Sequence, residues 1–141
     1  MSKVALRSIK VDGKYYLWKR EHQHLDEFIY AKCVEKVTIF LKGYKKSPLY
    51  LLFREEDNPL LETDNKQVKW CVGYPDAGVI WSSVPDSVET ITYINLNRPA
   101  VIAALIRFFM KEKWQPASTS RPLKIEQALV WLSKIALPEG Y

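Results

Sequence analysis

The chain has 141 residues, of which 48% are hydrophobic, 26% charged and 13% aromatic. This length predicts one domain over residues 1–141, and the composition is typical of a globular protein, which excludes a low-complexity or fibrous one. The formal net charge of +5 comes from 21 basic and 16 acidic side chains that are mixed along the chain. It is compatible with a negatively charged partner but does not by itself point to one.

Apolar residues that alternate with polar ones predict β-structure over most of residues 1–96. Strands over residues 3–11 and 14–20 are separated by Asp12-Gly13, a pair that favours the positive φ angles of a type I′ hairpin turn. A second hairpin is expected from strands over residues 32–41 and 49–53. Residues 21–30 are compatible with either a loop or a short helix.

The next part of the chain carries weaker strand signals. We expect a polar loop over residues 54–66, because Asn58-Pro59 and Asp64-Asn65 favour turns. Short strands are expected over residues 67–72, 79–81 and 89–96.

The pattern changes to a helical period after Asn97, which we expect to be the N-cap of a helix that ends near Lys113. Within it, residues 99–110 contain one polar side chain, Arg107, and are too few to cross a bilayer, which takes about 20 apolar residues. A second helix is expected from about residue 122 to residue 137. Residues 1–96 would thus be β-rich and residues 97–137 helical.

These elements predict an α+β fold, with a mainly antiparallel sheet of about six strands followed by two C-terminal helices packed on one face. The first helix has a bulky side suited to the sheet and a second side built from Ala100, Ala103, Ala104 and Arg107. The second helix, or a second copy of the chain in a homodimer, is expected to cover that small-residue side.

The two cysteines, Cys33 and Cys71, lie in strand-like stretches and fit neither a redox CxxC motif nor a zinc ribbon. We expect both to be reduced core residues. The first residues lack the apolar core of a signal peptide, so a cytoplasmic location with no membrane association is expected.

Tyrosine and tryptophan are more numerous than one small core needs, and some are expected to line a surface or cleft that binds a ligand. The leading hypothesis is therefore a non-catalytic binding or interaction module for a protein partner or a small molecule. The candidate ligand-binding residues are Trp18, Tyr44, Trp70, Tyr74, Trp81 and Tyr93.

Two alternatives remain open. Lys42, Lys45 and Lys46 surround Tyr44 at a predicted hairpin turn, a pattern that suits phosphates and a stacked base in a basic nucleic-acid-binding module. His22 and His24 are two residues apart, so on an extended strand both lie on one face and could bind the metal of a small metal-dependent enzyme. No assembled catalytic set and no cofactor motif is recognisable, which favours a protein that is not an enzyme and has no cofactor.

Overall fold

The computed structural model describes residues 5–24, 33–54, 60–63, 66–72, 79–84, 87–131 and 135. In chain order the elements are β1 (Arg7–Val11), β2 (Lys14–His24), β3 (Cys33–Leu41), β4 (Leu49–Arg54), β5 (Leu60–Thr63), β6 (Lys66–Val72), β7 (Val79–Val84), β8 (Ser87–Asn95), α1 (Pro99–Glu112), β9 (Leu123–Ile125) and α2 (Ala128–Trp131).

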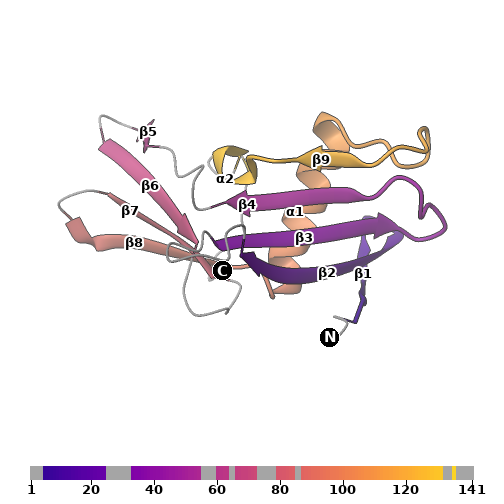
Figure 1. Cartoon of the computed structure of the whole chain (residues 1–141), viewed down its shortest axis with the longest axis horizontal. Helices are drawn as coiled ribbons and strands as arrows, with labels where there is room; N and C mark the ends of the chain where they lie inside the picture. Colours follow the sequence, from indigo (N-terminus) through magenta and orange to yellow (C-terminus); the bar gives the residue numbers. More distant parts are fainter. Residues whose placement is uncertain are drawn as a thin grey trace.

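The main layer is a five-stranded sheet in the order β1-β2-β3-β4-β9 (Figure 1). Neighbouring strands from β1 to β4 are antiparallel, whereas β9 runs parallel to β4 at the edge. Both predicted hairpins are present in this sheet. Asp12 and Gly13 have φ angles of 50° and 83°, as the first hairpin turn requires, and Gly43 has a φ of 91° in the second turn.

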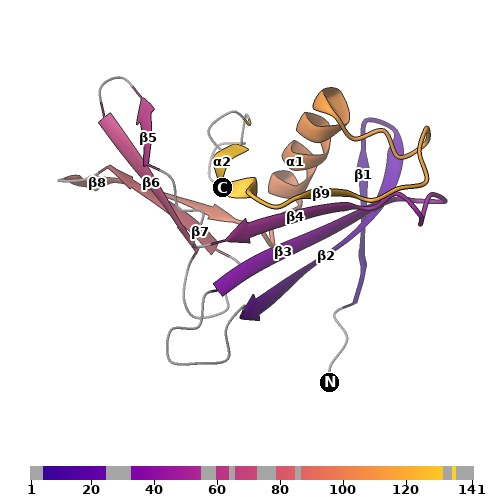
Figure 2. The ribbon, with the colours of Figure 1, turned by 45° about the horizontal axis from the view of Figure 1, so that its top comes forward.

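The second sheet is an antiparallel meander in the order β5-β6-β7-β8. It lies beyond the opposite end of β3 and β4 from their connecting turn, and the chain leaves β8 directly into α1 (Figures 1 and 2). Buried Ile80 and Ile94 of this sheet belong to the same apolar cluster as the residues between the five-stranded sheet and α1.

Helix α1 covers one face of the five-stranded sheet (Figure 2). Its buried residues recur at helical spacing, as expected for the bulky side, and Arg107 is exposed. They meet alternate residues of the strands, because successive strand residues lie on opposite faces of a sheet. The buried side chains of the helix are Val101, Ile102, Ala104, Leu105, Ile106 and Phe109.

The predicted fold class is wrong in two respects. The sheet that α1 covers has five strands and is mixed, and a second sheet holds the remaining strands of the described residues. The expected second helix is replaced by β9 and by the single turn α2. The physical reason is long-range pairing: Leu123 N donates to Pro48 O at 2.9 Å, and Ile125 is buried beside Leu51. Residues 123–125, which the local pattern assigns to a helix, thus pair with the edge of β4 as a strand.

Three local predictions also need correction. Residues 21–24 extend β2 and pair with β3, so they form neither a loop nor a helix, and residues 60–63 of the expected loop form β5. Asn97 is not the N-cap of α1. Arg98 occupies that position and makes no side-chain cap hydrogen bond, whereas the Asn97 side-chain oxygen accepts from Arg20.

Among the described residues, no helix is long and apolar enough to span a membrane. Helix α1 has 14 residues and is accounted for by burial against the sheets.

Candidate functional site

The start of β2 and the turn after β3 lie side by side at one end of the five-stranded sheet. Lys42 N donates to Tyr15 O at 3.0 Å, and Tyr44 N donates to Leu41 O at 2.9 Å, which closes the turn. Because strand neighbours alternate between faces, Tyr15 lies on the opposite face from its buried neighbour Tyr16. The pairing therefore brings Tyr15 close to the lysines of the β3–β4 turn.

This turn is fastened to the segment that follows α1. The indole Nε1 of buried Trp114 donates to Ser47 O at 3.0 Å, and the buried Ser47 hydroxyl donates to Pro116 O at 2.7 Å. Both views show the β3–β4 turn and the connection from α1 to β9 next to each other at the same end of the molecule (Figures 1 and 2). Buried hydrogen bonds of this kind hold the two segments in a fixed relative position.

Two tyrosine rings at this end are exposed to solvent, Tyr15 by 50% and Tyr44 by 44%. The ammonium nitrogens of Lys10 and Lys42 lie 5.5 and 5.9 Å from the centre of the Tyr15 ring, within the range of a cation–π contact. We use the term basic tip for the surface formed by Lys10, Lys14, Tyr15, Lys42, Tyr44, Lys45 and Lys46.

The basic tip contains two open hollows that share Tyr44. The first, called here the tyrosine hollow, measures about 360 Å³ and is lined by Lys14, Tyr15, Leu41, Lys42, Tyr44 and Ala117. The second, called here the hydroxyl hollow, measures about 370 Å³ and is lined by Gly43, Tyr44, Lys45, Lys46, Ser47, Thr119 and Ser120. Both volumes lie near the lower end of the range for ligand sites, roughly 300–1,000 Å³.

Among the described residues that line the two hollows, four are lysines and none carries a carboxylate. The acidic residue at the β1–β2 turn, Asp12, is 3.3 Å from Arg107 Nε in an exposed ion pair. Burial raises the pKa of Tyr16 above its usual value, and the nearby charge of Asp12 raises this pKa further. The positive charge of the lysines thus faces solvent in the described part of this end.

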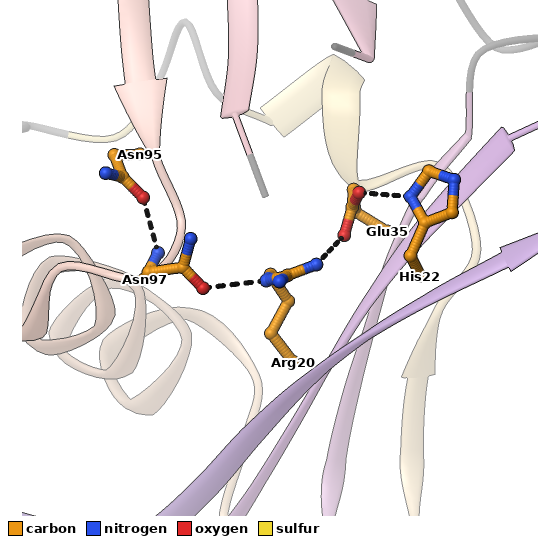
Figure 3. A network of polar contacts seen from close by, with 5 residues as sticks. All are labelled: Arg20, His22, Glu35, Asn95 and Asn97. Atoms are coloured by element: carbon orange, nitrogen blue, oxygen red, sulfur yellow. Dashed lines mark hydrogen bonds and ion pairs between the residues drawn. The ribbon is translucent and has the colours of Figure 1, made fainter. Parts of the chain in front are cut away.

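A second cluster of polar side chains lies in the interior, farther along β2 and β3 (Figure 3). Glu35 is completely buried, and its carboxylate accepts from Arg20 Nη1 at 2.8 Å and from His22 Nδ1 at 2.5 Å. The side chains of Arg20 and His22 are 17% and 5% exposed. A buried carboxylate of this kind is tolerated because cationic and N–H donors satisfy it.

The same network reaches the connection between β8 and α1. Arg20 Nε donates to Asn97 Oδ1 at 2.8 Å, and Asn97 N donates to Asn95 Oδ1 at 2.9 Å (Figure 3). It therefore links the five-stranded sheet to the chain segment that joins the second sheet to the helix. We refer to Arg20, His22, Glu35, Asn95 and Asn97 as the buried network.

The two histidines named as possible metal ligands lie on one strand. His22 and His24 both lie on β2, opposite Glu35 and Cys33 of β3 respectively. The Nδ1 atom of His22 is hydrogen-bonded to Glu35 Oε1, and the side chain of His24 lies outside the described residues. Within the described residues, no group of three or more His, Cys, Asp or Glu side chains is close enough to hold a metal ion.

The aromatic residues named from the sequence are dispersed. Trp18 is buried in the core, whereas Tyr44 lies on the basic tip. Trp70, Trp81 and Tyr93 lie on β6, β7 and β8, with Trp81 directly opposite Tyr93, and their side chains are outside the described residues. Tyr74 is also outside the described residues.

The structure brings together the three predicted lysines and Tyr44, and it adds residues that the sequence analysis did not single out. Tyr15 had a usable signal, since alternation along β2 places it opposite the buried face of Tyr16. Thr119 and Ser120 had none, because they approach the β3–β4 turn only through the contacts of Trp114 and Ser47.

No protein-family model, curated protein or solved structure matches this chain.

Proposed function

We propose that the protein is a non-catalytic binding module and that its basic tip binds a negatively charged ligand. One observation carries this proposal. Two half-exposed tyrosines and five lysines share one end of the sheet, and none of the described residues that line its two hollows carries a carboxylate.

The charge arrangement supports an anionic ligand. Lysines that lie in one patch raise the local concentration of anions, and each phosphate that a lysine neutralises releases a condensed counterion. Arg107 shows the contrast: it lies beside the β1–β2 turn, where it is already paired with Asp12. The lysine side chains of the tip have no such carboxylate among the lining residues that the structure describes.

The rigid frame of the tip supports binding as its role. A ligand loses less free energy in ordering the protein when the contact surface is already fixed. Ser47 lies within the β3–β4 turn and is held by Trp114 and Pro116. Tyr44 and Lys45, a few positions away, thus project from an anchored turn.

A non-catalytic role is supported by the surroundings of the ionisable side chains in the buried network. His22 and Glu35 are almost wholly removed from solvent, and the carboxylate is already engaged by two donors. A general base must reach the proton that it abstracts from a substrate. The contacts of this cluster instead serve the packing of β2, β3 and the β8–α1 connection.

Fluorescence anisotropy with a labelled inorganic polyphosphate chain tests the proposal. We expect saturable binding that weakens as salt rises. The double variant Lys45→Ala/Lys46→Ala should bind more weakly, with the slope of log affinity against log salt reduced by about 1.4, roughly 0.7 for each lysine.

The matched control is Lys19→Ala/Lys124→Ala, which removes two lysines outside the tip, from pairs with Glu21 and Glu126. It changes the net charge equally and should leave the affinity unchanged. Absence of saturable binding at low salt would overturn the proposal. Equal weakening in both double variants would also overturn it, because binding would then follow net charge alone.

A further inference from the structure

We infer that the ligand of the basic tip is a single-stranded nucleic acid, with a base in the tyrosine hollow and a phosphate in the hydroxyl hollow. This inference rests on the proposed function, which requires only a negatively charged ligand. It adds the chemical class of the ligand and the direction in which the ligand lies.

The tyrosine hollow has the chemistry of a base-binding site. It is lined by Tyr15 and Tyr44, which are both about half exposed, and by Leu41 and Ala117. A base presents a flat π-face that stacks on an aromatic ring, and its polar edge stays accessible to solvent and to cations. Lys14 and Lys42 line the same hollow and supply those cations.

The hydroxyl hollow has the chemistry of a phosphate site. Lys45 and Lys46 supply positive charge, and the Thr119 and Ser120 hydroxyls supply short hydrogen-bonding groups. Phosphate oxygens in nucleic-acid complexes are bound by lysine and by serine or threonine side chains. The Thr119 hydroxyl oxygen already accepts from Arg121 N at 3.3 Å, which leaves its hydrogen available for donation.

The two hollows adjoin one another, because Tyr44 lines both. A nucleotide likewise joins a flat base to a phosphate through one sugar. A polyphosphate or an acidic peptide satisfies the hydroxyl hollow and supplies no ring for the tyrosine hollow. Single strands are favoured over duplexes because the base must be free of its partner to stack on a protein ring.

The test compares four labelled probes of equal length by anisotropy: oligothymidylate, the same strand with abasic sites, its duplex and a glutamate-rich peptide. We expect oligothymidylate to bind about 5- to 150-fold more tightly than the abasic strand, as one stacked base would give. The variant Tyr15→Leu/Tyr44→Leu keeps apolar side chains and loses the rings. It should lose this preference and retain the affinity for the abasic strand.

The lysine variant Lys45→Ala/Lys46→Ala should weaken oligothymidylate and the abasic strand by the same factor. Equal affinities of the wild type for these two probes would overturn the inference and leave the proposed function standing. Tighter binding of the duplex or of the peptide would also overturn it, the peptide result indicating an acidic protein as partner. Failure to bind any of the four probes, or polyphosphate, would overturn both proposals. Thermal unfolding of each variant confirms that loss of affinity is not loss of fold.

Discussion

The buried network and the basic tip lie near opposite ends of the pairing between β2 and β3 and use their charges in opposite ways. In the buried network, the Glu35 carboxylate is held by Arg20 and His22, so its charge is used inside the protein. On the basic tip, lysines of the β3–β4 turn face solvent, and the described residues that line the same hollows include no carboxylate. The difference teaches that charged side chains can stabilise the fold in one part of a sheet and remain available to a ligand in another.

The largest effect is expected at the buried network. Glu35→Leu removes the carboxylate to which Arg20 and His22 donate and leaves two buried donors without it. We expect a loss of about 3–5 kcal/mol in the free energy of unfolding, measured by chemical denaturation. In the control Glu126→Gln, only an exposed pair with Lys124 is lost, so the change should stay below about 1 kcal/mol. A Glu35→Leu variant as stable as the wild type would show that the buried network does not stabilise the fold.

Ser47 combines features of both regions, because it is buried like the network and its hydrogen bond holds the turn of the basic tip. Ser47→Ala leaves the buried Pro116 carbonyl without its donor, which should cost about 1–3 kcal/mol by the same denaturation measurement. The loosened turn should also weaken polyphosphate binding. Ser118→Ala, at an exposed neighbour, is the control for both readouts. Normal binding in the destabilised Ser47→Ala variant would show that the anchored turn is not needed.

The buried face of β2 next to the tip has its own pH dependence. Because the pKa of Tyr16 is raised in the folded protein, this hydroxyl stays protonated where the unfolded chain has begun to ionise near pH 10. The associated stability is present below pH 10 and is lost as pH rises through the folded pKa. Alkaline unfolding curves of Tyr16→Phe should therefore fall less steeply than those of the wild type, and identical curves would contradict this.

The smallest effect is expected at the exposed pair between Asp12 and Arg107. Both side chains are more than half exposed, so Arg107→Ala should change stability by less than about 1 kcal/mol. It frees Asp12 near the basic tip, which should lower the affinity for polyphosphate slightly. A large loss of stability here would mean that surface and buried charges do not differ as the comparison requires.

The sequence predicts best those features that depend on neighbours along the chain. The two hairpins follow from alternation and from turn residues such as Asp12 and Gly13, and the structure contains both. The expected second helix fails because Leu123 pairs with the β4 edge more than seventy residues away along the chain. A three-residue strand with a distant partner leaves no local period to recognise.

The same division applies to the candidate site. Lys42, Lys45 and Lys46 can be grouped with Tyr44 from the sequence alone because one turn holds them all. Glu35 shares the strand face of Val37 and Ile39, and this alternation is a signal for a buried carboxylate. The identity of its donors follows only from the pairing of β2 with β3.

The most direct test of the account is a two-dimensional amide spectrum of the isotope-labelled protein titrated with oligothymidylate. We expect saturable shifts at residues 10–15, 42–47 and 117–120, with the amides of Arg20, His22 and Glu35 unchanged. Shifts centred on β5 to β8 or on the buried network would contradict it, as would a titration in which no amide shifts saturably.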